Sequence, residues 1–336
     1  MSLLRKNLLV LVLLLFVYSW YFLSHSTPTQ KSISVSGESA NVSLSIEPQA
    51  GRSVILDEIN SAKSEILVEV YLLSDKTIIE ALKDAKARGI SVDVMLEEHP
   101  FGGGNLNNAT EKELVSAGIS VEWANPAFSL THEKAIIIDG KKAFILSQNL
   151  TTSSFSKNRE YDILDTNIKD VQEIRTIFID DWQRKSFTQS SPNLVISPNS
   201  SRKILTSFIQ KSTKSIDIEI EDIEDGNIIS LLSSKVKTIP VRLIAPTLSQ
   251  INSNNTALMA LQKEGVLIKT LASPYMHAKL ILSDNTKAFV GSVNLSTQSL
   301  DKNRELGIIL SDQKIIKKLS DTFSSDWNKG SDFIQK

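Results

Sequence analysis

The chain repeats a set of polar residues at a constant interval, and this repeat limits the possible folds more than any other feature. His132 and His277 are 145 residues apart, and the same interval separates Lys134 from Lys279. Six further pairs keep this interval: Asp139 and Asp284, Ser147 and Ser292, Asn149 and Asn294, Arg159 and Arg304, Glu160 and Glu305, and Trp182 and Trp327. Chance does not align so many polar residues without a gap, so the sequence predicts a gene duplication that produced two similar halves.

Each half alternates between segments of helical and of strand periodicity. In the first half, residues 52–62 and 77–88 have the pattern of amphipathic helices, and residues 65–73 and 90–96 that of strands. The same order recurs from residue 202 onward. This alternation predicts an α/β fold of two similar layered domains, each with a mixed β-sheet flanked by helices. We expect the two domains to pack with pseudo-twofold symmetry, so that both histidine motifs meet in one cleft.

Four segments follow from these patterns. Residues 46–190 form the first repeat and residues 191–336 the second. Residues 24–45 are rich in Ser, Thr, Asn and Gln, which is typical of a linker. Residues 1–23 form a separate apolar segment at the N-terminus.

This N-terminal segment has the pattern of a membrane signal. Arg5 and Lys6 precede a run from Leu8 to Leu23 without a charged residue. The run is shorter than the ~20 residues of a full span and longer than the core of about 7–15 residues in a cleaved signal. No convincing cleavage site follows it. The sequence therefore favours an uncleaved anchor with the catalytic body on the extracytoplasmic side; secretion after signal cleavage is the alternative.

The spacing of the histidine and lysine suits phosphoryl transfer. His132 and Lys134 are two positions apart, as are His277 and Lys279, so on a strand both side chains point to the same face. One imidazole can attack phosphorus while the neighbouring ammonium neutralises an oxygen. Two copies supply a nucleophile and an acid that protonates the leaving alcohol.

Each half reads H-x-K-x4-D followed by S-x-N, and this pattern resembles the phospholipase D superfamily signature H-x-K-x4-D-x6-G-S-x-N. The resemblance covers roughly residues 46–330. The second half matches throughout, whereas the first has Leu146 in place of the glycine, which we expect to alter the approach of the backbone to phosphate. The resemblance implies a metal-independent phosphodiesterase that works through a phosphohistidine. It also implies that Glu160 and Glu305 hydrogen-bond the histidine rings.

The candidate residues fall into two groups. The predicted catalytic set contains His132, Lys134, Asn149, Glu160, His277, Lys279, Asn294 and Glu305. Four further motif residues have both a structural and a functional reading: Asp139, Ser147, Asp284 and Ser292. By analogy to the family, we assign nucleophilic attack to His132 and acid–base duty to His277.

Composition narrows the chemistry. The chain has no cysteine, which excludes disulfides, thiolate metal sites and a cysteine nucleophile. No cluster of carboxylates and histidines predicts a metal site, and we expect no cofactor. With 37 basic and 38 acidic residues, the net charge of −1 gives no sign of a nucleic-acid partner.

The leading hypothesis is therefore an enzyme that hydrolyses phospholipid, because an anchored body would work at a bilayer. The same chemistry leaves a membrane-tethered nuclease as the alternative. A catalytically inactive binding module is disfavoured, since both motifs keep every polar member. Beyond the phosphodiester substrate and the membrane, the sequence implies no obligate protein partner.

Overall fold

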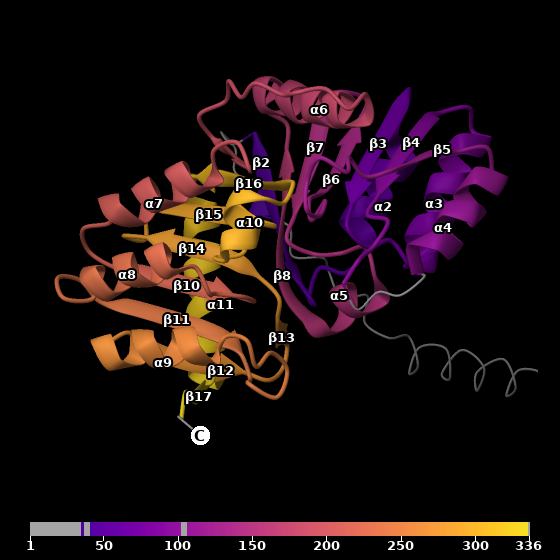
Figure 1. Ribbon diagram of the computed structural model, residues 1–336. Helices are drawn as coiled ribbons and strands as arrows, with labels where there is room; N and C mark the ends of the chain where they lie inside the picture. Colours follow the sequence, from indigo (N-terminus) through magenta and orange to yellow (C-terminus); the bar gives the residue numbers. More distant parts are fainter. Residues whose placement is uncertain (1–34, 37–40, 102–105, 335–336) are drawn as a thin grey trace, which may run out of the picture. The chain divides into compact units, whose positions relative to one another are not determined.

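The computed structural model describes residues 35–36, 41–101 and 106–334, and these residues belong to one compact unit (Figure 1). Two β-sheets of the same design dominate it. The first sheet has the order β1 (Val35–Ser36), β2 (Val42–Glu47), β8 (Asn158–Asp165), β7 (Lys142–Leu146), β6 (Lys134–Ile138), β3 (Glu65–Val70), β4 (Ser91–Leu96) and β5 (Ser120–Trp123). The second has the order β9 (Leu194–Ser197), β16 (Glu305–Leu310), β15 (Lys287–Gly291), β14 (Lys279–Ser283), β10 (Ile216–Ile220), β11 (Val241–Pro246), β12 (Leu267–Leu271) and β17 (Ser331–Asp332).

From β2 to β5 and from β9 to β12, the two sheets match strand for strand. In both, parallel and antiparallel pairs are mixed: β3 pairs with β4 in parallel and with β6 antiparallel, and β10 pairs in the same way with β11 and β14. Two mixed-sheet α/β layers flanked by helices confirm the fold class predicted from the repeat.

Three helices cover the outer face of each sheet. The first sheet carries α2 (Ser53–Ser61), α3 (Lys76–Ala87) and α4 (Leu106–Ser116), and the second carries α7 (Ser201–Lys211), α8 (Gly226–Lys235) and α9 (Asn255–Glu264) (Figure 1). Alternation along the strands produces this arrangement, since Ile66 and Val68 pack in the cluster under the helices while Leu67 packs in the central core.

The central core joins the two sheets. It contains apolar residues of both, together with residues of α6 (Ile168–Trp182) and α11 (Gln313–Lys329). Two short helices, α5 (Thr152–Lys157) and α10 (Thr297–Asp301), follow the S-x-N motifs. Because this core takes residues from both sheets, the two halves share one buried core.

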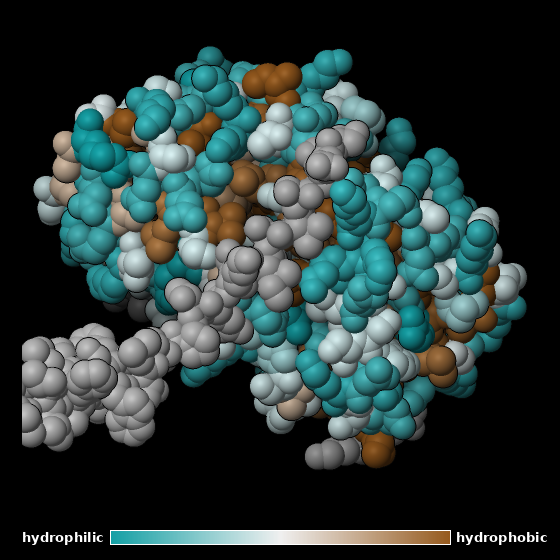
Figure 2. All heavy atoms as spheres, turned by 180° about the vertical axis from the view of Figure 1, so that it is seen from behind, coloured by the Kyte–Doolittle hydropathy of each residue, from teal (hydrophilic) through white to brown (hydrophobic). Residues whose placement is uncertain are grey.

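Figure 2 shows that the face opposite to the view of Figure 1 is mostly hydrophilic, with apolar residues in separate patches.

Most predicted helices and strands have counterparts within a few residues, but the predicted linker is partly wrong. Val42–Glu47 is strand β2, which pairs antiparallel with β8, so residues 42–45 belong to the sheet. The alternation of Val42, Leu44 and Ile46 with polar residues suits a strand, and these side chains pack in the central core while β8 supplies the pairing partner. The division between residues 190 and 191 falls between α6 and β9, and we keep it as a proposal.

The predicted localisation requires a correction. No helix in the described part of the chain is both long and apolar enough to cross a membrane. Residues 1–23, where the anchor was expected, lie outside the described residues. Neither the anchored nor the secreted localisation is therefore supported.

Candidate active site

Each histidine lies in a segment that reaches across to the other repeat. His277 follows the short strand β13 (Tyr275–Met276), which pairs in parallel with the first residues of β8 in the first sheet. On the other side, Thr131, directly before His132, forms an isolated parallel bridge with Arg304. These two bridges place the histidine of one repeat beside the glutamate-bearing strand of the other.

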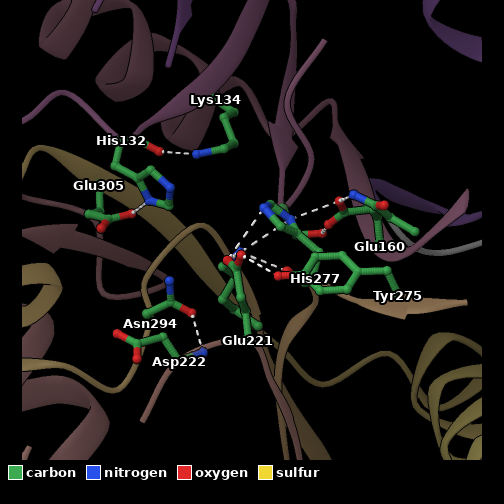
Figure 3. Close-up of polar contacts among 12 residues, drawn as sticks. His132, Lys134, Glu160, Glu221, Asp222, Tyr275, His277, Asn294 and Glu305 are labelled. Carbon is green, nitrogen blue, oxygen red and sulfur yellow. Dashed lines mark hydrogen bonds and ion pairs between the residues drawn. The ribbon is translucent and has the colours of Figure 1, made fainter. Parts of the chain in front are cut away.

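The histidine–glutamate pairs are consequently exchanged between the repeats. Nδ1 of His132 lies 2.9 Å from Oε2 of Glu305, and Nδ1 of His277 lies 2.8 Å from Oε1 of Glu160 (Figure 3). Both carboxylates are fully buried. Within each repeat the glutamate follows the histidine by 28 residues, but the folded chain pairs each histidine with the glutamate of the opposite half.

Burial and charge set the protonation of the first pair. Burial lowers the pKa of His132, although the Glu305 carboxylate opposes this. Burial alone would raise the pKa of Glu305, but the charge of His132 and the hydrogen bond to it prevail, and the pKa is lowered. The carboxylate therefore stays ionised and holds the Nδ1 proton of the ring.

The two lysines are buried and have different neighbours. Nζ of Lys134 donates to the carbonyl oxygen of His132 at 2.5 Å and lies 5.3 Å from the centre of the Tyr71 ring. Nζ of Lys279 donates to the equivalent oxygen of His277 at 2.6 Å and to Oε2 of Glu221 at 2.7 Å. Burial lowers the pKa of Lys134 to about 7.

Sequence reasoning missed Glu221. Its Oε2 lies 3.3 Å from Nε2 of His277, and Tyr275 donates from its hydroxyl to Oε1 at 3.2 Å (Figure 3). Burial favours its neutral form, but the charges of His277 and Lys279 outweigh this and lower its pKa. The feature that could have identified Glu221 is its position directly after strand β10, which is equivalent to the position of Tyr71 directly after β3. The two are 150 residues apart, so the interval of 145 does not align them.

Both histidines line one cleft of about 620 Å³. Asn149 and Asn294 line it as well, and they follow β7 and β15, respectively. The remaining lining residues are Tyr71, Leu72, Phe101, Leu130, Glu221, Asp222, Glu224, Gln250, Ile251, Asn252, Ser253, Ser296, Gln298, Ser299 and Asn303. The fold thus brings the histidines and asparagines of both motifs together, with the two lysines buried behind the histidines.

The motif serines lie behind this cleft. Ser147 is buried; its hydroxyl donates to Oε2 of Glu160 at 2.7 Å and accepts from the backbone N–H of Tyr161 at 2.9 Å. Ser292 is also buried, and its hydroxyl donates to the carbonyl of Leu306 and accepts from the N–H of the same residue. Ser147 therefore supports a glutamate, and Ser292 supports a strand.

The motif aspartates are turn residues outside the cleft. Asp139 has a φ of 54° and accepts from the backbone N–H groups of Lys63, Ser64 and Glu65. Asp284 has a φ of 57° and makes the same kind of contacts with residues 213–215. Both carboxylates tie the turn between two strands to the segment that ends a helix, which is a structural role.

The glycine of the second motif serves strand packing. A Cβ at Gly291 would lie 2.3 Å from the Cα of Gly307 on the neighbouring strand. The residue opposite Leu146 in the first sheet is Asp162. The expectation that Leu146 alters the approach of the backbone to phosphate is therefore replaced by a packing explanation: only the second sheet has a glycine pair at this position.

Comparisons with known proteins agree with this arrangement. A family described as "Cardiolipin synthase, PLD-like domain" matches residues 55–182 and 205–327. Cardiolipin synthase 1 of Bacillus cereus (strain ATCC 14579) is 24% identical over 327 residues, covering 82% of this chain and 64% of the relative. The chain is therefore similar to about two thirds of that protein's length.

Two solved structures are similar to this chain in fold, and at their low sequence identity the similarity says nothing beyond the fold. Phosphatidylserine synthase from Haemophilus influenzae Rd KW20 superposes with a TM-score of 0.65 at 12% identity over 90% of both chains. Polyphosphate kinase from Porphyromonas gingivalis gives a TM-score of 0.71 at 15% identity, covering 88% of this chain and 48% of the kinase.

The duplicated motif, the two matching sheets and the family match define a phospholipase D-like protein with both motifs in one chain, and the chain belongs to that family. This confirms the family predicted from the two H-x-K motifs. It also supports the prediction of an enzyme, a phospholipase D-like enzyme that acts on phosphodiesters.

Proposed function

We propose that this protein is a phosphodiesterase that cleaves the head group from phospholipids through a phosphohistidine. One observation carries the proposal: two histidines, each with a buried carboxylate at Nδ1, line the same cleft. A carboxylate at Nδ1 fixes the tautomer and directs Nε2 to the reacting atom. This is the arrangement that nucleophilic attack followed by proton donation requires.

In the first step, Nε2 of His132 attacks phosphorus. The P–N bond forms as the bond between phosphorus and the head-group oxygen breaks, and that oxygen takes a proton from Nε2 of His277. In the second step, His277 takes a proton from water, whose oxygen attacks phosphorus and releases His132. An alcohol in place of water gives transfer instead of hydrolysis.

The surroundings of the histidines support this assignment. His277 has Glu160 near Nδ1 and Glu221 near Nε2, so a carboxylate faces each ring N–H of an imidazolium. His132 has one carboxylate, Glu305, and burial lowers its pKa, which favours a neutral nucleophile. The two asparagines that line the cleft are donors for the non-bridging oxygens of phosphate, and the buried lysines add positive charge behind the histidines.

Phospholipid is favoured as the substrate by the name of the similar protein of Bacillus cereus, a cardiolipin synthase. The acidic lining of the cleft also favours phospholipid over nucleic acid. Of the described residues that line it, none is lysine or arginine, and three are acidic: Glu221, Asp222 and Glu224. A polyanion such as DNA needs a basic track, so the nuclease reading is not favoured.

The test offers the full chain phospholipid vesicles and single-stranded DNA side by side in excess EDTA. We expect release of head group and no shortening of DNA. Metal independence remains a prediction of the histidine mechanism. Loss of head-group release on chelation, with recovery when a divalent ion is added, would contradict it, and cleavage of DNA alone would establish the nuclease reading.

A further inference from the structure

The two walls of the cleft differ in polarity although they come from equivalent parts of the two repeats. Tyr71 and Leu72 follow β3, and Glu221 and Asp222 follow β10. These strands are equivalent, because Val70 pairs with Lys134 and Ile220 pairs with Lys279. The two repeats have therefore diverged here, with a tyrosine and a leucine on one wall and two carboxylates on the other.

Further residues extend the same division. The wall of the first repeat also has Leu130 and Phe101, whose side chain is 91% exposed. The wall of the second repeat also has Glu224, which is exposed. The apolar and aromatic lining residues thus come mostly from the first repeat, whereas all three carboxylates of the lining come from the second, beside Ile251 and neutral polar residues.

The carboxylates of the acidic wall lie close enough to influence one another. Burial raises the pKa of Asp222 to about 6, with contributions from Glu224 and then Glu221. With a pKa of about 6, Asp222 is still largely ionised at neutral pH, and the charges of His277 and Lys279 keep the pKa of Glu221 low. Such a group of negative charges beside the reacting phosphate repels a second anion and attracts a cation.

We propose that Asp222 and Glu224 select a leaving head group that carries a positive charge, such as an ammonium. The phospholipid then lies across the cleft with its head group over the second repeat and its diacylglycerol part, which carries the apolar acyl chains, over the first. This inference rests on the proposed function. It also fits the assignment of His277 as acid, because the leaving oxygen lies on the side of the head group.

The experiment presents two phospholipids with identical acyl chains in the same detergent micelles. Phosphatidylethanolamine has an ammonium in its head group, and phosphatidylglycerol has an uncharged one. Because both share each micelle, the surface charge acts equally on them. The measured quantity is the ratio of released ethanolamine to released glycerol, and we expect the wild-type protein to release more ethanolamine.

The variant Asp222→Asn/Glu224→Gln should lower this ratio about fivefold, the order expected for removing two partly exposed charges. The control Asp57→Asn/Asp84→Asn makes the same change of net charge at exposed positions on α2 and α3, outside the cleft, and should keep the wild-type ratio. Glu224→Gln alone, at an exposed position, should lower the ratio in the same direction if the double variant does not fold.

Two outcomes would overturn the inference, and they are distinguishable. If both head groups are released but the ratio is the same in wild type and variants, the acidic wall does not select charge, and the proposed function stands. If the wild-type protein releases neither head group, the proposed function fails and the inference with it.

Discussion

Residues that the repeat makes equivalent have different surroundings. His132 stands edge-on to Tyr71, with ring centres 4.9 Å apart, whereas Nε2 of His277 faces Glu221 at 3.3 Å. Two identical imidazoles can therefore take different protonation states, which a displacement with one nucleophile and one acid requires. Divergence at Tyr71 and Glu221 makes a symmetric motif into an asymmetric site.

The first prediction separates the two histidines. His132→Ala and His277→Ala should each lower turnover of phospholipid by at least about 10³-fold, because the two act as a unit. With a nitrophenyl phosphodiester, protonation of the leaving group matters less. His277→Ala should then still form the phosphohistidine and accumulate label on His132, measured by mass spectrometry after rapid quenching. His132→Ala should trap no label.

Label recovered on His277 in the His132→Ala protein would reverse the assignment. Near-normal turnover in either variant would remove the paired-histidine mechanism altogether. Circular dichroism of both variants controls for loss of folding.

The second prediction concerns Lys134. Because burial lowers its pKa to about 7, the protein without substrate should lose the ammonium as the pH rises through 7. A bound anion stabilises the charged form, so added inorganic phosphate should raise this pKa. The measurement is an NMR titration of the lysine ¹³Cε resonances, with Lys134→Met identifying the signal. A signal that moves only above about pH 9 without phosphate would contradict the prediction.

At the scale of elements, several motif residues lie at the ends of neighbouring strands. Lys134 and Lys279 begin β6 and β14, and Glu305 begins β16. Each of these strands is fixed on both sides by neighbouring strands, so the side chains at its end have little freedom. The close approach of Gly291 and Gly307 belongs to this level, since it sets the spacing of β15 and β16.

The third prediction tests that spacing. Gly291→Ala should lower the free energy of unfolding by about 2 kcal/mol, within the range for overpacked interiors, because the added Cβ meets backbone that cannot move aside. Urea denaturation measures the change. Gly226→Ala is the matched control: a Cβ there meets nothing within 4 Å, so stability should stay equal or rise slightly. Equal stability of both variants would show that the strands can separate at no cost.

At the scale of the whole molecule, the repeats exchange charged partners as well as histidine–glutamate pairs. Arg159 of the first repeat donates to Oδ1 of Asp326 on α11 at 3.0 Å. Arg304 of the second donates to Oδ1 of Asp181 on α6 at 3.0 Å. All four side chains are buried. With a common apolar core between the sheets, these ties make the halves depend on each other.

The fourth prediction follows from this dependence. Arg159→Met should lower the free energy of unfolding by about 3 kcal/mol, because it leaves the buried Asp326 with only the more distant, half-exposed Lys329 at 3.7 Å as a cationic partner. The double variant Arg159→Met/Asp326→Leu should recover part of the loss. Scanning calorimetry should find one transition in each protein, shifted in temperature. Two separate transitions in the single variant would mean that the repeats fold independently.

Much of this architecture could be predicted from the sequence. The interval of 145 residues identified the duplication, and the alternation of periods identified an α/β fold. β8 escaped prediction because it begins with the polar residues Asn158, Arg159 and Glu160, and β16 because it begins with Glu305. These polar residues are buried by pairing with neighbouring strands and by their place in the active site. Neither can be predicted from the local pattern of apolar and polar residues. Glu221 was missed because its equivalent in the first repeat is Tyr71, and because the repeats differ in length between this position and the histidine, so that the interval of 145 residues does not align the two.

The sequence by itself determined which residue types are available and that they occur twice, since covalent order preserves a duplicated spacing. Only the tertiary structure decided which glutamate serves which histidine. Glu160 and Glu305 each pair with the histidine of the opposite repeat, because β13 and the bridge at Thr131 cross between the sheets. Such a pairing depends on how two sheets pack around one core, and no spacing along the chain records it.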